Sequence, residues 1–119
     1  MIVDIDDFNY SKIVEDCDTP IFIDFYSPSC PPCQELLPLL EPLDEYAKGE
    51  VLIAKVDVSR SPKIAQKFQI RGVPLCITIG VDKMVKEHKS GLGDANSYFK
   101  MIDKVLNKEK KGFFAKLFS

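Results

Sequence analysis

The sequence predicts an α/β fold in which helices cover both faces of a central sheet. Three short apolar runs have the length and the β-branched and aromatic content of buried strands: residues 21–26, 51–58 and 74–79. Segments with apolar residues at helical spacing alternate with these runs. Residues 74–79 and 84–89 flank a turn and indicate an antiparallel hairpin. The predicted order of elements is therefore βαβαβαββα.

The helix starts are predicted from capping residues. Asp6 or Asp7 can cap a first helix that runs to about Glu15 and places Phe8 on its apolar side. Ser61, followed by a proline, is expected to cap a later helix.

Prolines interrupt the long leucine-rich helix expected after residue 33. Pro38 and Pro42 each remove a backbone hydrogen bond and should kink or break this helix. Gly49 is a natural residue to follow its C-terminus. A last amphipathic helix is expected to begin after residues 93–94, a Gly-Asp cap.

Length and composition indicate one globular domain. The chain has 119 residues, of which 45% are hydrophobic and 29% charged, and it has four cysteines. Its first ten residues are acidic where a secretory signal needs positive charge, so we expect a reducing, cytoplasmic location. In that compartment a Cys-x-x-Cys pair is catalytic or metal-binding more often than a permanent cross-link.

Charge divides the chain into an acidic body and a basic C-terminus. Residues 1–103 hold 11 basic and 17 acidic side chains, whereas residues 104–119 hold five and one. The acidic body argues against nucleic-acid binding. We assign residues 1–106 to the domain and 107–119 to a basic amphipathic extension, which could lie on an anionic membrane, dock on a partner, fold back or be disordered.

Cys30 and Cys33 are the strongest candidates for chemistry. Cys30 falls where a strand ends and a helix begins, so unpaired backbone N–H groups and the helix dipole should lower its thiol pKa. Cys33 lies one turn further on the same face, within disulfide range. Cys30 can attack a substrate disulfide and Cys33 can resolve the mixed disulfide. Structural zinc is disfavoured, since the other Cys and His residues are scattered singly.

Asp24 interrupts a buried strand with a carboxyl group. Burial would raise its pKa, which makes Asp24 a candidate general base for Cys33. Lys55, in the next apolar strand, could be its partner. The periodicity alone leaves a second interpretation open, in which both residues face the solvent-side edge of the sheet.

These features together resemble the thioredoxin family over about residues 2–106. The resemblance depends on linked motifs: "IDFY" followed by "CPPC", Pro38, "AKVDV", "IRGVP" at 70–74, and Gly91. It implies a thioredoxin fold, with a central mixed sheet of four to five strands flanked by about four helices. It also implies Cys30 as nucleophile, Cys33 as resolving thiol, Asp24 as buried proton acceptor beside Lys55, and Pro74 in cis facing the disulfide.

The same resemblance implies disulfide-bearing client proteins and a thioredoxin reductase or equivalent electron donor, with no cofactor and no metal, in a protein expected to be a monomer. A cis Val73–Pro74 bond would leave the Val73 backbone free to pair with an extended client. The expected client surface is small and apolar: Pro28, Pro31, Gly72, Val73 and Gly91.

Several positions depart from the family pattern. Ser29 precedes the nucleophile, Pro31 replaces a glycine, Tyr26 replaces a tryptophan, and the chain has no tryptophan. Pro31 removes an N–H beside the Cys30 sulfur, so the redox potential is left open. A protein-disulfide reductase is the leading hypothesis; a more oxidising thiol oxidase or isomerase and a redox-silent binding module are the alternatives.

Cys76 is a further unusual residue, two positions beyond Pro74. It is interpreted either as a buried strand residue or as a third redox thiol.

Overall fold

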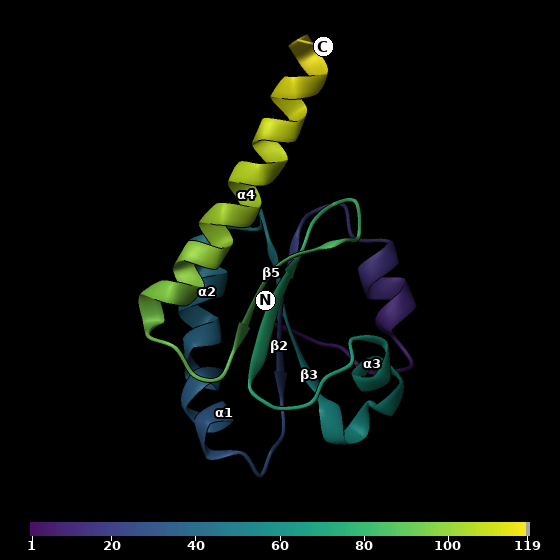
Figure 1. Ribbon diagram of the computed structural model, residues 1–119, viewed down its shortest axis with the longest axis vertical. Coiled ribbons are helices and arrows are strands. Elements are labelled where there is room, and N and C mark those ends of the chain that lie inside the picture. The colour runs from purple at the N-terminus through teal and green to yellow at the C-terminus, as the bar shows by residue number, and fades with distance from the viewer. Residues whose placement is uncertain (119) are drawn as a thin grey trace.

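A five-stranded mixed sheet forms the centre of the molecule (Figure 1). The computed structural model describes the backbone of residues 1–118 and the side chains of residues 1–109. The sheet order is β1-β3-β2-β4-β5, with β1, β3 and β2 parallel and β4 and β5 antiparallel to their neighbours. The strands are β1 (Val3–Asp4), β2 (Ile21–Tyr26), β3 (Leu52–Asp57), β4 (Leu75–Ile79) and β5 (Val85–Ser90).

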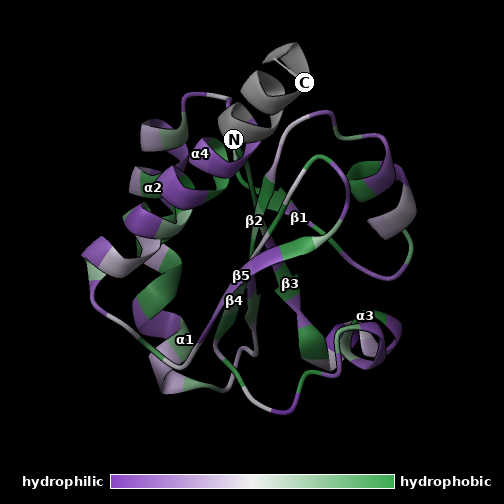
Figure 2. Ribbon diagram, turned by 45° about the horizontal axis from the view of Figure 1, so that its top comes forward, coloured by the Kyte–Doolittle hydropathy of each residue, from purple (hydrophilic) through white to green (hydrophobic). Residues whose placement is uncertain are grey.

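Helices cover both faces of this sheet, as the sequence predicts. In Figures 1 and 2, α2 and α4 lie on one face and α3 lies on the other. The helical elements are η1 (Ser11–Glu15, a π-helix), α1 (Pro31–Leu36), η2 (Leu37–Leu39, a 3₁₀ helix), α2 (Leu40–Ala47), η3 (Val58–Arg60, a 3₁₀ helix), α3 (Pro62–Lys67) and α4 (Ala95–Phe118).

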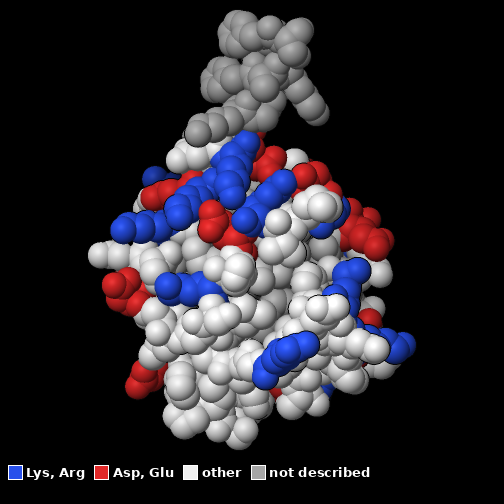
Figure 3. Space-filling model, in the orientation of Figure 1, with Lys and Arg blue, Asp and Glu red and all other residues white. Residues whose placement is uncertain are grey.

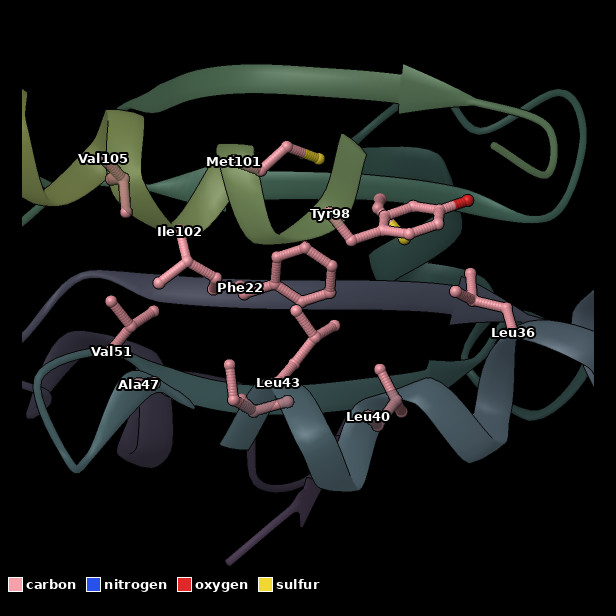
Figure 4. Packing of buried hydrophobic residues seen from close by; sticks show 12 residues of the cluster. Phe22, Leu36, Leu40, Leu43, Ala47, Val51, Tyr98, Met101, Ile102 and Val105 are labelled. Atoms are coloured by element: carbon pink, nitrogen blue, oxygen red, sulfur yellow. The ribbon is translucent and has the colours of Figure 1, made fainter. Parts of the chain in front are cut away.

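Two hydrophobic cores, one on each face, hold the layers together. The core under α2 and α4 is shown in Figure 4, where Phe22 of β2 lies between Leu43 of α2 and Ile102 of α4. The second core packs Ile23 and Phe25 of β2 against Ile64 of α3. The continuous apolar run of β2 is needed because both of its faces are covered.

The N-terminal helix differs from the prediction. Only the short π-helix η1 forms, and Phe8, expected on an apolar side, is 98% exposed. The Asp6 carboxylate accepts hydrogen bonds from the Phe8 and Asn9 amides at 2.8 and 3.0 Å, so it closes a tight turn that points Phe8 outward.

Asp7 caps a helix that is distant in sequence. Its carboxylate accepts hydrogen bonds from the backbone amides of Lys63 and Ile64, at 3.0 and 2.9 Å, in the first turn of α3. Ser61, predicted as the cap of that helix, makes no capping hydrogen bond with its side chain. Two amides in the first turn of α3 are therefore satisfied from 56 and 57 residues away. The predicted helix start, with Ser61 as N-cap residue and Pro62 next, is confirmed, but Asp7 makes the capping hydrogen bonds expected of the Ser61 side chain.

Of the two helix breaks predicted at prolines, one is confirmed. The 3₁₀ helix η2 at Pro38 separates α1 from α2, but α2 continues through Pro42. Pro42 is the third residue of α2, where its missing N–H has no partner within the helix. The helix ends as predicted, with left-handed φ angles of 50° at Lys48 and 78° at Gly49.

The last helix begins at a capping aspartate and runs past the predicted end of the domain. The Asp94 carboxylate accepts a hydrogen bond from the Ser97 amide at 3.1 Å. Further along the helix, Lys108 forms an ion pair with Glu87 at 3.3 Å, and the Glu109 carboxylate accepts from the Val81 amide at 3.2 Å. The division between residues 1–106 and 107–119 stays a prediction, and the aromatic and basic side chains of the extension beyond 109 lie outside the described residues. In the described part of the chain, no helix is long and apolar enough to cross a bilayer.

Candidate active site

Cys30 and Cys33 form a disulfide at the start of α1. Cys30 is the N-cap residue, with extended backbone angles of −99° and 111°, and its Cα lies 5.2 Å from that of Cys33. The Cys33 amide donates a hydrogen bond to the Cys30 sulfur at 3.2 Å. Cys30 is half-buried whereas Cys33 is fully buried, so a substrate can reach only the first of the two sulfurs.

The two prolines of the motif limit the hydrogen bonds available to the Cys30 sulfur. Pro31 and Pro32 occupy the first two helical positions and have no N–H to donate. The Gln34 amide bonds to the Cys30 carbonyl oxygen at 3.1 Å. The Cys33 amide is therefore the first in this helix that can hold negative charge on Cys30.

The segment before β4 forms the wall opposite Cys30. The Val73–Pro74 peptide bond is cis, and the Cys30 sulfur lies 3.8 Å from the Val73 carbonyl oxygen. The Gly91 amide donates to the Pro74 carbonyl oxygen at 2.9 Å and so ties this segment to the end of β5.

A pocket of about 480 Å³ runs from this wall across β4 and β5. Three of the five residues predicted to contact clients line it, namely Gly72, Val73 and Gly91, along with apolar residues such as Phe68 and Ile70. The other two, Pro28 and Pro31, lie on either side of Cys30 in the sequence and do not line this pocket. On the face drawn in Figure 3, the end of the molecule that holds α1 carries few charged side chains.

Asp24 is fully buried, which decides between the two interpretations of its strand. Burial raises the pKa of the Asp24 carboxyl to about 7, against smaller lowering effects of a hydrogen bond from Cys76 and of the Lys55 charge. The Cys76 sulfur lies 3.8 Å from Asp24 Oδ1, and Oδ2 has no hydrogen-bond partner in the described residues. Asp24 can therefore exchange a proton near neutral pH.

Lys55 lies beside Asp24 in the sheet but its ammonium group points elsewhere. The two residues are direct neighbours in the pairing of β2 with β3. Lys55 Nζ lies 3.6 Å from Asp4 Oδ1 and 5.9 Å from the centre of the Tyr26 ring. The Lys55 charge lowers the pKa of Asp24, but this is the smallest of the three effects on that pKa.

Sequence reasoning missed the contact between Cys76 and Asp24. The two residues are paired across β2 and β4. An alignment of the predicted strands in an antiparallel register would have placed them side by side, because directly opposite residues share a face.

Cys30 is a half-buried cysteine at a helix N-terminus, and it is bonded to the buried Cys33 one turn later in an α/β fold of this topology. This arrangement defines a thiol-disulfide oxidoreductase. Comparison with known proteins agrees with this class. The family model "Thioredoxin" matches residues 1–104, and the chain belongs to the thioredoxin family.

Individual relatives and structures support the same assignment. The chain is 30% identical over 106 residues to a thioredoxin of Rickettsia felis, covering 89% of this chain and all of that protein. It is 33% identical over 97 residues to a thioredoxin of Chlorobaculum thiosulfatiphilum, covering 82% and 89% of the two chains. The crystal structure of chloroplastic thioredoxin z superposes with a TM-score of 0.78 at 24% identity, over 89% of this chain and 95% of that one, which shows the common fold. The protein is thus a disulfide reductase of the thioredoxin type, acting on disulfide-containing substrates with a reductase as electron donor.

Proposed function

We propose that the protein reduces disulfide bonds of client proteins in a reducing cytoplasm, with Cys30 as the attacking thiolate and Cys33 as the resolving thiol. The observation that carries the proposal is the unequal exposure of the two bonded sulfurs. Cys30 attacks one client sulfur, forms a mixed disulfide and releases the other client sulfur as a thiolate. Cys33 then attacks Cys30, forms the internal disulfide and releases the second client thiolate. Two electrons pass from the protein to the client, and the reductase donor returns them.

Asp24 serves as the proton acceptor in the second step. Cys33 must lose its proton before it can attack, and it is buried away from bulk solvent. Cys33 and the equally buried Leu36 are one turn apart on α1, and Leu36 packs in the same core as Phe22, two residues before Asp24 on β2. Both features support a position of the Cys33 sulfur on the same side of the sheet as the Asp24 carboxyl. Lys55 favours the ionised form of Asp24 through its charge.

A client strand is expected to bind in extended form beside Val73. The Val73 backbone next to Pro74 borders both the Cys30 sulfur and the pocket that continues over β4 and β5. Backbone hydrogen bonds to Val73 would hold many different sequences, while the apolar pocket takes a client side chain. Room around the Cys30 sulfur is left by small neighbouring residues, namely Pro28, Pro31, Gly72 and Gly91.

The direct test is reduction of insulin driven by dithiothreitol. We expect the wild-type protein to accelerate the reaction and Cys30→Ser to abolish the acceleration, because no mixed disulfide can form. Cys33→Ser should trap the mixed disulfide, which mass spectrometry would detect. Cys17→Ser is the matched control: Cys17 is a free, half-buried cysteine whose sulfur contacts Thr19, and its loss should leave the rate unchanged.

The proposal fails if the wild-type protein reduces insulin no faster than Cys30→Ser. Equilibration with glutathione buffers separates the reductase from an oxidase or isomerase, since a more oxidising redox potential would reverse the net direction of exchange.

A monomeric state and a contact of residues 107–119 with a membrane or a partner remain predictions. Deletion of residues 108–119 followed by co-sedimentation with anionic liposomes tests the membrane contact.

A further inference from the structure

A row of polar side chains crosses the whole sheet in register. The five strands contribute one residue each, in the spatial order Asp4, Lys55, Asp24, Cys76 and Lys89. Directly paired residues point to the same face of a sheet. Phe22, two residues before Asp24, belongs to the core under α2 and α4, so the row lies on that covered face. Asp24 and Cys76 are its two buried members, 0% and 1% exposed.

Cys76 supplies the hydrogen bond that the Asp24 carboxyl receives. Its sulfur lies 3.8 Å from Oδ1, within the range of a thiol donor. Oδ2 is buried and has no hydrogen-bond partner among the described residues. Lys55, the neighbour on the other side, directs its ammonium group to Asp4 and the Tyr26 ring. The two carboxyl oxygens therefore differ in hydrogen bonding: Oδ1 receives the Cys76 thiol and Oδ2 receives no donor among the described residues.

The Cys76 thiol keeps its proton over the range in which Asp24 titrates. Burial raises the pKa of Cys76 well above its ordinary value, and the neighbouring Asp24 charge raises it further. A protonated thiol can only donate to an ionised carboxylate, so the bond from Cys76 favours the charged form of Asp24. The same pKa makes Cys76 a poor nucleophile, which argues against a third redox thiol.

We propose that Cys76 is a positioning residue for Asp24: its thiol holds Oδ1 and leaves Oδ2 as the atom that accepts the proton of Cys33 during disulfide exchange. The inference rests on the proposed role of Asp24. The Cys33 proton moves to Oδ2, directly or through one water, and the Cys33 thiolate displaces the client thiolate from Cys30. The proton then passes to the client thiolate or to solvent, and Asp24 is ionised again. Cys76 neither gains nor loses a proton.

Ionisable groups on β2, β3, β5 and α4 interact electrostatically with this pair. Lys55 approaches from β3 and favours the ionised Asp24, while Lys89 of β5 favours ionised Cys76. Tyr98 of α4 and Tyr26 at the end of β2 both have pKa values raised mainly by burial and in part by the Asp24 charge. None of these side chains changes in the variants below, so their influence is constant.

The test compares Cys76→Val, Cys76→Ser and the control Thr78→Val. Valine removes the donor and is larger than cysteine by about one methyl group, whereas serine keeps a donor. Thr78 is buried on the same face of β4, and its hydroxyl accepts a hydrogen bond from the Glu87 amide, so Thr78→Val removes a partly buried hydrogen bond that does not involve Asp24. Carbon-13 NMR of aspartate-labelled oxidised protein follows the titration of the Asp24 carboxyl. A second measurement follows release of the client thiol from a disulfide peptide in a single turnover, from pH 6 to pH 9.

We expect Cys76→Val to raise the titration midpoint of Asp24 by roughly half to one pH unit, the effect of one lost hydrogen bond. Cys76→Ser should titrate at or below the wild-type midpoint, and Thr78→Val should match the wild type. The pH profile of thiol release should move with the Asp24 midpoint, and release near pH 7 should slow about twofold to fivefold in Cys76→Val.

An Asp24 midpoint that is the same in Cys76→Val and wild type would overturn the proposal, because the thiol would then not bind the carboxyl. A shifted midpoint with an unchanged release profile would also overturn it, since Oδ2 would not be the proton acceptor. In both cases insulin reduction through Cys30 and Cys33 would continue, so failure of this inference is distinguishable from failure of the reductase function. If Cys76→Val does not fold, Cys76→Ser alone decides: a midpoint above that of the wild type contradicts the donor role.

Discussion

Asp24→Asn should stabilise the protein at neutral and alkaline pH. The Asp24 carboxyl is fully buried and its pKa is raised to about 7 by burial, whereas its ordinary value is 3.8. Asparagine has nearly the same shape, keeps an oxygen for the Cys76 thiol, and carries no charge at any pH. The substitution therefore removes the pH-dependent part of the burial cost and little else.

The size and sign follow from proton linkage. Below pH 3.8 Asp24 is protonated in both the folded and the unfolded chain, so the full stability is present. Between pH 3.8 and about 7 the unfolded chain releases the proton and the folded chain keeps it, so the free energy of unfolding falls as pH rises. At about 1.4 kcal/mol per pH unit this interval amounts to about 4 kcal/mol, after which the loss levels off. This is a large fraction of the stability of a domain, which is about 5–15 kcal/mol.

The measurement is guanidinium unfolding at several pH values from 4 to 9, with the Cys30–Cys33 disulfide intact. Far-UV circular dichroism is the appropriate probe, because the chain has no tryptophan for fluorescence. We expect the free energy of unfolding of Asp24→Asn minus that of wild type to increase by about 4 kcal/mol between pH 4 and pH 8. Using this difference cancels the titration of all other acids, which both proteins share.

Asp18→Asn is the control, since Asp18 is exposed and loses little hydration on folding. Its difference from wild type should vary little with pH. A difference for Asp24→Asn that is constant to within about 1 kcal/mol from pH 4 to pH 8 would refute the reasoning, because it would mean that folding does not desolvate the carboxylate.

Two further predictions concern hydrogen bonds that join distant parts of the chain. Asp7→Ala should lower the free energy of unfolding, measured by guanidinium unfolding, by about 1–2 kcal/mol, because two amides of α3 lose their acceptor. Asp6→Ala opens only a local turn and should cost less in the same measurement; equal costs would contradict the long-range cap. Tyr98→Phe should cost about 1 kcal/mol, since the Gly93 amide donates to the buried Tyr98 hydroxyl at 2.8 Å. Tyr46→Phe, which removes the exposed contact between Tyr46 and Asp103, is its control and should lie nearer to wild type.

The elements that the sequence predicted well are those whose pattern is set by burial on two faces. Residues 21–26 form β2 with the predicted ends, because every position of a central strand must be apolar unless it has a function. The strand pattern identified Asp24 as the one violation but left open whether it is buried or faces the solvent-side edge of the sheet, which its burial decides. Cys30 was predicted at a helix start for a similarly local reason, since prolines are favoured in a first turn.

The features that sequence reasoning missed depend on contacts between distant residues. Ser61 has the local pattern of a cap, but Asp7 reaches the same amides from the N-terminal segment. Lys55 and Asp24 are neighbours in the sheet, yet the rotamer of a long side chain is decided by competition among Asp4, Tyr26 and Asp24. Neither outcome is encoded in the spacing of residues along one strand.

The two outer strands of the sheet differ in a way that affects how other chains can add to it. On one side β1 has only two residues, too few to template another strand. On the other side β5 reads Val-Lys-Glu-His-Lys-Ser and presents charged side chains along its length. Short edge strands and charged edge strands both disfavour the addition of a strand from another chain to the sheet. The binding of an extended client that we propose at Val73, beside the Cys30 sulfur, therefore has little competition from the two edges of the sheet.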